Sequence, residues 1–443
     1  MSERETIHLA ADLSFLHTDF LWRMPGSWVG YPYYSTSEFY EDIAKTAERG
    51  RFDLLFFGDT GGTSEDYGGN YDAVVRNGVK WPRHDMTAMI PILARMTEGV
   101  GYALTMSTTY HHPFHCARTF NALDHVTGGR IGWNAVTSAY KGEAANWGFE
   151  EMMDHDERYR RAQEFLQVTC ELWDSVEPDA LVMDRESGVF VDPEKVHRID
   201  FKGEYFNVRG PLPALPSPQQ RPLIIQAGQS GPGMDLAATY ADLQFSTRRT
   251  VDSMKQHRAA LDKKLAAFGR KPRDLGILWS VRVQVAESQS EANAKEKAFL
   301  DAIPPEAGLI EISQWFGVDF ATAELDMTLA DFADQVKEVN GNLGTFEEIV
   351  KTTEPNMTVR ELGRDYMTKR IMSAEGTPKE IVDKLEMMHF ETGANGGFIL
   401  GRGYHATDNI TEFVEHVVPE LQRRGRFRTA YTGKNLRENL GDD

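Results

Sequence analysis

The stretch RIGWNAVTSAYKGEAANWGFEEMMDHDERY, residues 130–159, decides how the rest of the chain can be interpreted. It opens with a strand predicted over Arg130–Thr137, which is rich in β-branched and aromatic residues. After an irregular segment a helix begins, with acidic residues in its first turn. His155 and Tyr159 are four residues apart, so they share one face of that helix. We therefore expect Asn134 and these two side chains to point into one space above the end of the strand.

Strand-like and helix-like runs alternate along the chain on both sides of this stretch. Eight strands are predicted, at residues 7–14, 53–59, 100–107, 130–137, 222–228, 241–246, 275–285 and 396–400. The predicted helices lie at residues 37–50, 85–97, 113–126, 155–173, 251–268 and 410–424. This order favours an α/β fold, a (β/α)8 TIM barrel with insertions. A doubly wound open sheet is the competitor, but residues 14–18, SFLHT, lack the glycine-rich turn that usually follows its first strand.

Two segments interrupt the alternation within a single barrel domain predicted over residues 1–443. Residues 177–221 are rich in Asp, Gly and Pro and are expected to form a hairpin-like insertion. Residues 289–375, after the seventh strand, are expected to form a longer and mostly helical insertion. An insertion of this length at a barrel active site is a candidate lid or channel wall that keeps water out.

Composition and charge narrow the classes of protein and partner. The chain has 443 residues, with 41% hydrophobic and 26% charged, as is usual for globular proteins. A net charge of -19 argues against nucleic acid or an anionic membrane as the main partner. The only two cysteines, Cys116 and Cys170, could form at most one disulfide, which cannot be what stabilises so long a chain. We therefore expect free thiols and a cytoplasmic location. No signal peptide and no membrane span are predicted.

In a TIM barrel, functional groups lie just beyond the C-terminal ends of the strands. Five successive strands of this chain are followed by or end in such groups: His17, Asp59, Thr105, Asn134 and Ser230. The last of these lies in QAGQSGPG, residues 226–233, a glycine-rich turn between a strand and a helix. Free N–H groups and the helix dipole at such a turn suit a phosphate, although many turns of this kind bind nothing.

Several motifs in order carry a resemblance to a known family. They are FDLLFFGD (52–59), TMSTTYHHPFHCARTFNALDHVTGGRIGWNAVTS (105–138), HDERYRRAQEF (155–165), PSPQQRPLIIQAGQSGPG (216–233) and VVPELQRRGRFRTAY (417–431). With these motifs the chain resembles the bacterial luciferase-like flavin monooxygenases. Within that family it is similar to the branch of nitrilotriacetate, dibenzothiophene-sulfone and long-chain alkane monooxygenases.

The resemblance implies a two-component monooxygenase that binds FMN as FMNH2, supplied by a separate NAD(P)H-dependent flavin reductase. It implies that O2 is the co-substrate and that one oxygen atom passes from a flavin peroxide to a small organic substrate. Xenobiotic, aromatic and sulfur- or nitrogen-containing compounds are all candidates. The aromatic-rich opening of the chain favours a flat, apolar substrate.

The resemblance also implies roles for particular residues. The implied flavin contacts are Asp59 and Thr105 near the ring and ribityl chain, His155, Tyr159 and Ser230 at the phosphate, and Asn134 and Gly228 beside the same site. The implied substrate pocket lies near Ser14, His17, Tyr67 and Asn134. Of these, His17 and Asn134 are the predicted catalytic groups, with His17 as the candidate proton donor because histidine titrates near neutral pH.

Two other functions use the same binding residues and stay open. One is a deazaflavin-dependent oxidoreductase of the same superfamily, and the other is a non-catalytic flavin-binding barrel. A metal site is not expected, because the cluster of His111, His112 and His115 has no carboxylate or cysteine at matching spacing. The polar tail, RTAYTGKNLRENLGDD (428–443), is expected to pack as an arm against a partner subunit, and we predict a homodimer or homotetramer.

Overall fold

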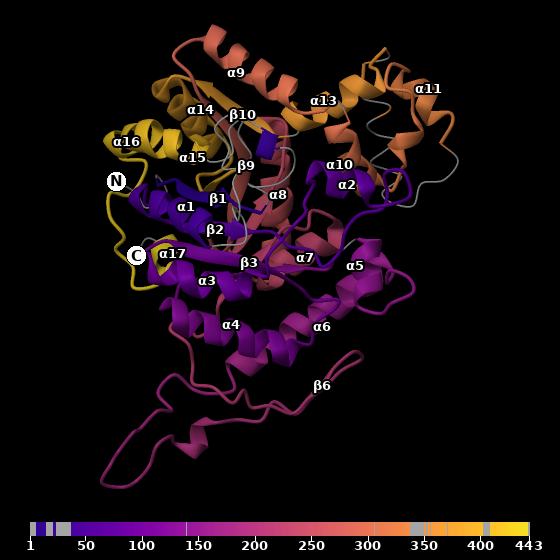
Figure 1. Ribbon diagram of the computed structural model, residues 1–443. Helices are drawn as coiled ribbons and strands as arrows, with labels where there is room; N and C mark the ends of the chain where they lie inside the picture. Colours follow the sequence, from indigo (N-terminus) through magenta and orange to yellow (C-terminus); the bar gives the residue numbers. More distant parts are fainter. Residues whose placement is uncertain are drawn as a thin grey trace.

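The computed structural model describes residues 6–14, 21–23, 37–138, 140–304, 306–336, 350, 353–354, 356–369, 371–401 and 408–441. Within these residues eight parallel strands form a closed barrel (Figure 1). In barrel order they are β1 (His8–Asp12), β2 (Leu54–Phe57), β3 (Gly101–Ser107), β4 (Ile131–Val136), β7 (Leu223–Gln226), β8 (Leu243–Ser246), β9 (Gly276–Val285) and β11 (Gly396–Leu400). The pairing of β11 with β1 closes the ring. The predicted TIM barrel is confirmed, and each strand lies inside its predicted range.

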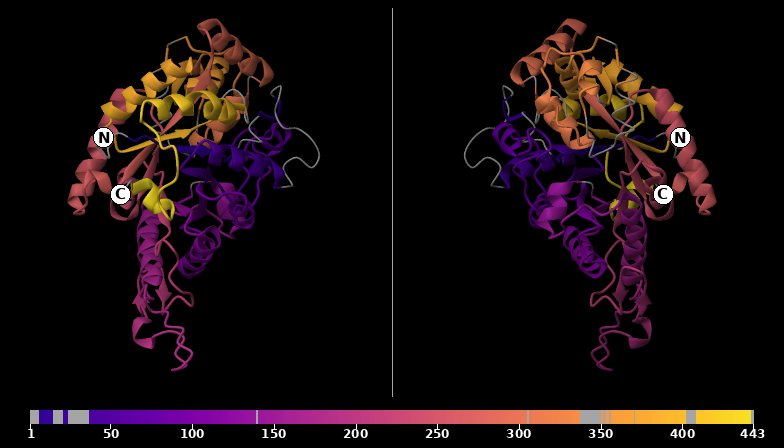
Figure 2. Two further views of the ribbon diagram at one scale, coloured as in Figure 1. Left: turned by 90° about the vertical axis from the view of Figure 1, so that its left-hand side faces the viewer. Right: turned by 90° about the vertical axis from the view of Figure 1, so that its right-hand side faces the viewer.

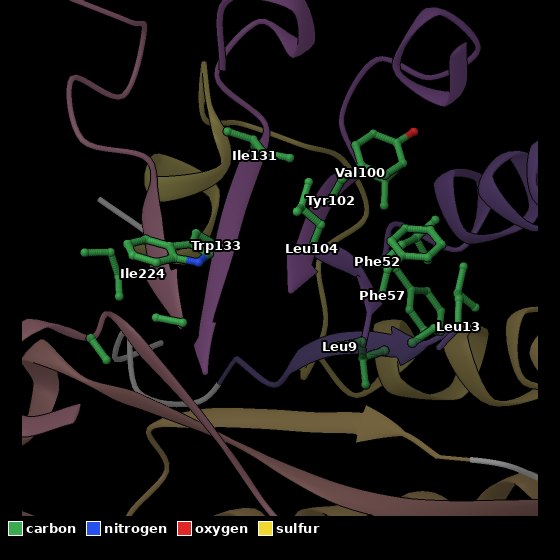
Figure 3. Packing of buried hydrophobic residues seen from close by; sticks show 14 of the residues in the cluster. Leu9, Leu13, Phe52, Phe57, Val100, Tyr102, Leu104, Ile131, Trp133 and Ile224 are labelled. Carbon is green, nitrogen blue, oxygen red and sulfur yellow. The ribbon is translucent and has the colours of Figure 1, made fainter. Parts of the chain in front are cut away.

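Side chains alternate between the inside and the outside of the barrel, as the two-residue period of a strand requires. Ala10, Ala103 and Leu278 belong to the cluster inside the barrel. Their neighbours Leu9 and Tyr102 belong to the larger cluster between the strands and the outer helices. Figure 3 shows part of this outer cluster. Because both faces are covered, the strands are nearly continuous in apolar residues, which is why the sequence identifies them so clearly.

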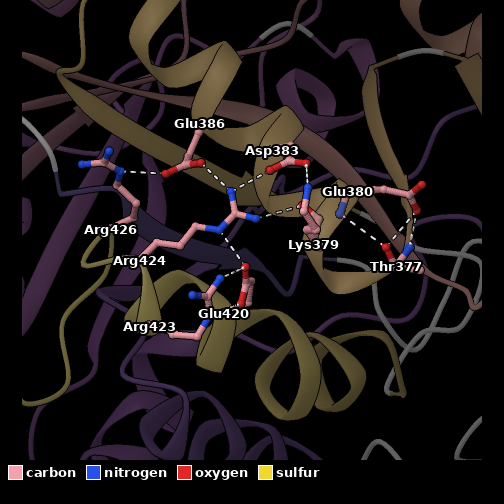
Figure 4. A network of polar contacts seen from close by, with 9 residues as sticks. All are labelled: Thr377, Lys379, Glu380, Asp383, Glu386, Glu420, Arg423, Arg424 and Arg426. Atoms are coloured by element: carbon pink, nitrogen blue, oxygen red, sulfur yellow. Dashed lines mark hydrogen bonds and ion pairs between the residues drawn. The ribbon is translucent and has the colours of Figure 1, made fainter.

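Helices form the outer layer around the barrel. They include α1 (Glu38–Arg49), α3 (Met86–Arg95), α4 (Pro113–Thr127), α6 (His155–Trp173), α7 (Gly231–Tyr240), α8 (Val251–Ala267), α14 (Pro378–Glu391) and α15 (Asp408–Glu412). Two short helices, α2 (Asp72–Asn77) and α5 (Lys141–Asn146), lie in the connections after β2 and β4. After α15 come η6 (Phe413–Val417) and α16 (Val418–Arg423). The guanidinium of Arg424 joins these last helices to α14 by contacts with Asp383, Glu386 and Glu420 (Figure 4). No helix in the described part of the chain combines the length and the apolar character needed to cross a membrane.

Residues 177–221 project from the barrel as a long arm, visible in Figure 1 and in both views of Figure 2. The arm contains the short antiparallel pair β5 (Phe201–Lys202) and β6 (Asn207–Val208). Its base is held by the carboxylate of Glu164 on α6, which accepts hydrogen bonds from the N–H groups of residues 204–206. Met183 and Phe190, farther along the arm, are each 63% exposed.

The segment after β9 lies over one end of the barrel. It contains α9 (Gln289–Ala302), α10 (Ala307–Phe316), η5 (Phe320–Thr322), α11 (Leu329–Ala333) and α13 (Val359–Lys369). It ends in β10 (Met372–Gly376), a ninth parallel strand that pairs with the second half of β9. In Figure 1 α10 lies beside α2, near the C-terminal ends of the barrel strands.

The C-terminal tail packs against its own barrel, and its predicted packing on a partner subunit stays a prediction. Its helix α17 (Leu436–Gly441) inserts the fully buried Leu436 into the cluster inside the barrel. The Tyr431 hydroxyl donates to the carbonyl of Phe52 at 2.8 Å. Sequence reasoning overlooked this contact because the tail is short and polar, and Leu436 and Leu440 are its only leucines.

Candidate active site

A cavity of about 470 Å³ opens at the C-terminal end of the barrel. Strand ends supply one side of it, including Asp59, Thr105, Asn134 and Gly228, together with Tyr159 of α6. The segment after β9 supplies the other side, including Phe299, Glu311, Trp315, Tyr366 and Thr368. The volume is that of a typical small-molecule site, and the location is where TIM barrels hold their active sites.

Asn134 presents a buried hydrogen-bonding atom that lacks a partner among the described residues. Its Nδ2 donates to Thr105 Oγ1 at 2.9 Å, across the paired strands β3 and β4. Its Oδ1 is buried and has no hydrogen-bond partner among the described residues. Leaving such an atom unsatisfied is costly, so this amide is arranged to accept a hydrogen bond from a ligand in the cavity.

Asp59 follows β2 and lies in the wall of the cavity. Burial raises the pKa of Asp59 to about 6, although the guanidinium of Arg83, 3.9 Å away, acts against this rise. Next to it, Thr60 Oγ1 donates to Glu143 at 2.9 Å. The Asp59 side chain remains 38% exposed. It is therefore an acceptor that a bound molecule can reach.

The glycine-rich turn after β7 is packed so closely that only glycine fits at two of its positions. A Cβ atom on Gly228 would lie 2.9 Å from the Tyr159 hydroxyl oxygen, and one on Gly233 would lie 3.0 Å from it. Ser230 is the N-cap of α7, and its Oγ accepts from the Gly233 N–H at 3.3 Å. The N–H groups at a helix start have no intrahelical partner, so the turn forms a cradle for an anion beside a phenol hydroxyl.

A buried arginine, Arg158, fixes the first turn of α6, and the sequence analysis did not identify this residue. Asp154 caps this helix, accepting from the N–H of Asp156 at 2.9 Å. Arg158 is 5% exposed and donates to the carbonyls of Met153 and Ser138. It thereby ties the loop after β4 to the helix that carries His155 and Tyr159, whose ring centroids lie 4.9 Å apart.

The structure brings together most of the site residues predicted from the sequence. Asp59, Thr105, Asn134, Tyr159 and Gly228 line the cavity, and His155 and Ser230 flank Tyr159 and Gly228. Ser14 lies at the rim, where its Oγ bonds to Asp12 and accepts from the Gly58 N–H. Tyr67 packs in the cluster that contains Phe299, one layer behind the cavity wall. His17 lies outside the described residues.

Several cavity residues were missed because they come from loops and from the long insertion. Lys80 is 7% exposed, and its ammonium lies 5.6 Å from the centre of the Trp315 ring. Glu311 on α10 is 1% exposed, and Tyr140 packs edge-on to Trp315. A charged residue within an apolar helix, as in AGLIEISQWF, is the sequence signal that could have identified Glu311.

Comparison with known proteins identifies the family that this arrangement represents. The model of the luciferase-like monooxygenase family matches residues 24–396. The chain belongs to the luciferase-like monooxygenase family. It is 36% identical to dibenzothiophene-sulfone monooxygenase of Rhodococcus erythropolis (strain XP), over 100% of this chain and 98% of the relative. It is 38% identical to nitrilotriacetate monooxygenase component A of Aminobacter aminovorans, over 95% and 92% of the two chains.

A solved structure gives the same result. DmoA of Hyphomicrobium sulfonivorans superposes with a TM-score of 0.88 at 32% identity, covering 99% of this chain and 92% of that one. As a member of the luciferase-like monooxygenases, the protein is a flavin-dependent monooxygenase. The cavity, the anion cradle and the unsatisfied Asn134 amide are the features of this chain that suit a flavin.

Proposed function

We propose that the protein binds reduced FMN and uses O2 to insert one oxygen atom into a small organic substrate, with a separate NAD(P)H-dependent reductase supplying the flavin. The observation that carries this proposal is the single cavity that reaches both Asn134 and Gly228. A phosphorylated flavin needs an anion site at one end and hydrogen-bonding partners for its ring at the other. The relative from Aminobacter aminovorans is named as component A, which supports a separate second component.

The residues present fit the cofactor at both ends. His155, Tyr159 and Ser230 would hold the phosphate, since the Tyr159 hydroxyl and the start of α7 meet at Gly228 and Gly233. Asp59, Thr105 and Asn134 would receive the polar edge of the ring and the ribityl hydroxyls. The Asn134 Oδ1 would gain there the hydrogen bond that the described part of the chain does not provide.

When bound, reduced flavin supplies the electrons that activate O2. The protein's own contribution is to orient the reactants and to exclude water. We propose that α10 and α13 act as the lid that does so, because Trp315 and Tyr366 from these helices form the cavity wall opposite the strand ends. Tyr140 and Trp315, with ring centroids 6.4 Å apart at an interplanar angle of 71°, would contact a flat apolar substrate.

A test must separate this function from the deazaflavin enzyme and from the flavin carrier. We would supply photoreduced FMN to the protein under 18O2, with dibenzothiophene sulfone, dimethyl sulfide or nitrilotriacetate as substrate probes. Product containing one 18O atom supports the proposal. Binding of FMN with no substrate-dependent O2 uptake would instead favour the carrier. Tight binding of a deazaflavin together with weak binding of FMN would favour the deazaflavin enzyme.

The predicted homodimer or homotetramer remains a proposal, and the arm of residues 177–221 is its support. The arm projects from the barrel (Figure 1). Its exposed apolar residues are Leu181, Val182, Met183, Val189 and Phe190. Exposed apolar side chains in this number commonly mark a protein contact. We expect light scattering to show a species larger than the 50.0 kDa chain, and Phe190→Asp to shift it toward the monomer. A wild-type protein that scatters as a monomer would contradict this expectation.

A further inference from the structure

A chain of three polar side chains lies behind the glycine-rich turn and contacts it from outside the barrel. Gln244 of β8 is fully buried, and its Nε2 donates to the carbonyl of Gly228 at 3.0 Å. His257 of α8 is 5% exposed and lies 2.8 Å from Gln244 Oε1 through its Nε2. Arg248 lies 2.6 Å from the His257 Nδ1. The chain thus runs from a half-buried arginine to the backbone of the turn.

The direction of every hydrogen bond in this chain follows from the arginine. A guanidinium can only donate, so the Nδ1 of His257 must accept and its Nε2 must carry the proton. The Nε2–H then donates to Gln244 Oε1, which fixes the orientation of the Gln244 amide with its NH2 group toward Gly228. Burial, with the charges of Arg248 and Arg258, lowers the pKa of His257 to about 4, so the ring is neutral as this pattern requires.

The hydrogen bond from Gln244 to the Gly228 carbonyl determines the direction of the Gln229 N–H group. The Gly228 carbonyl and the Gln229 N–H belong to one trans peptide unit, so they point in opposite directions. Because Gln244 holds the carbonyl from behind, the Gln229 N–H faces the open side of the turn. The same network holds the Gln229 side chain, whose Oε1 accepts from Arg248. On the other side of Gly228, its own N–H donates to Gln226 Oε1.

We propose that the chain of Arg248, His257 and Gln244 is a positioning device that aims the Gln229 N–H at the cofactor phosphate. It thereby sets the preference for a flavin that carries a phosphate. The inference rests on the proposed FMN site, and none of its three residues lies among the residues that the sequence predicts to contact the flavin. These are positioning residues, because they act on the phosphate through the backbone of the turn.

The test is equilibrium binding of oxidised FMN and of riboflavin, which lacks the phosphate, followed by flavin fluorescence. In His257→Phe the Gln244 amide loses its fixed orientation. We expect the dissociation constant for FMN to rise about tenfold while that for riboflavin changes by less than about twofold. Gln244→Met, which removes the donor to Gly228 at similar volume, should give the same pattern. His257→Gln, which can still accept and donate, should restore most of the preference.

His389→Gln is the matched control, because His389 is 2% exposed on α14 and does not contact the turn. It should bind both flavins as the wild type does. Equal weakening of FMN and riboflavin in the His257 and Gln244 variants, or an unchanged ratio, would overturn the positioning role alone. A wild-type protein that binds riboflavin as tightly as FMN would overturn the phosphate site, and with it the FMN proposal.

Discussion

Strand β2 carries an aspartate near each of its ends, and the two carboxylates serve opposite purposes. Asp53 lies at the N-terminal end of the barrel, where its side chain is fully buried and contacts His8 at 3.0 Å and Arg428 at 2.5 Å. Asp59 lies at the C-terminal end, partly exposed to the cavity, with Arg83 at 3.9 Å. One end of the strand is therefore satisfied within the protein, and the other keeps an acceptor open.

The two carboxylates also have opposite pKa shifts. Burial alone would raise the pKa of Asp53, but Arg428, His8 and the Leu9 N–H together outweigh it and hold the pKa below its usual value. At Asp59 burial dominates and raises the pKa to about 6. We call the N-terminal end of the barrel, with Asp53, the closed end, and the C-terminal end, with the cavity and Asp59, the open end. The difference in pKa indicates that charges at the closed end stabilise the fold, whereas charges at the open end are available to a ligand.

The largest effect is expected from breaking the closed end with Arg428→Met. This change leaves the buried Asp53 with the His8 ring and the Leu9 N–H as its partners, and removing one partner of a buried pair costs about 3–5 kcal/mol. We expect the free energy of unfolding in urea to fall by that amount. The folded fraction should still bind FMN normally, because Arg428 is at the opposite end of the barrel from the cavity.

Arg423→Met is the matched control for this prediction. Arg423 also forms an ion pair, with Glu420 at 2.7 Å, but its side chain is 70% exposed. Exposed pairs contribute little, so the stability of this variant should match that of the wild type. If both arginine variants lost the same stability, the closed end of the barrel would not have the special role described above.

The next effect concerns the open end and is produced by Gly228→Ala. The added Cβ would lie 2.8 Å from Gln226 Oε1, 2.9 Å from the Tyr159 hydroxyl and 3.1 Å from Gly233 Cα, so these two side chains or the turn itself must shift. We expect FMN affinity to fall about tenfold or more, through loss of at least one hydrogen bond to the phosphate. Gly148→Ala, where a Cβ meets open space, should leave binding unchanged, although its positive φ makes a small loss of stability expected. Unchanged FMN binding in Gly228→Ala would contradict the cradle.

Much of the fold followed from the sequence, because buried parallel strands are nearly continuous apolar runs and the barrel rule then places polar strand-end residues in one cavity. Asp59, Thr105 and Asn134 were found in this way. Lys80 and Glu311 were not, since their approach to the cavity depends on how the insertion folds over the barrel. His257 was missed because it contacts Gln244 across 13 residues of sequence, a pairing that no local pattern reveals. The contact of the tail with its own barrel was missed because its buried anchor, Leu436, stands in a short polar stretch.

A smaller effect should distinguish the two aspartates by their dependence on pH. The folded pKa of Asp59, about 6, lies above its usual value of 3.8, so between these values the folded state binds more protons than the unfolded state. Asp59 therefore costs stability as the pH rises from about 4 to about 6, and Asp59→Asn removes this cost. We expect the Tm of the variant relative to the wild type to increase from pH 4.5 to pH 7. Parallel Tm curves over this range would contradict the raised pKa.

The smallest effect is expected from Arg437→Gln in the tail helix. This variant tests whether every charge at the closed end contributes to stability. The Arg437 guanidinium contacts Asp242 at 2.5 Å, but its side chain is 41% exposed. Partly exposed pairs of this kind are worth about 0–1 kcal/mol, because water screens them and ordering two long side chains costs entropy. We expect a loss below about 1 kcal/mol in urea unfolding that shrinks further in high salt. A loss as large as that of Arg428→Met would mean that α17 is held by charge. The small loss would mean that Leu436, buried inside the barrel, holds the tail in place, and that the closed end depends on one buried ion pair rather than on charge in general.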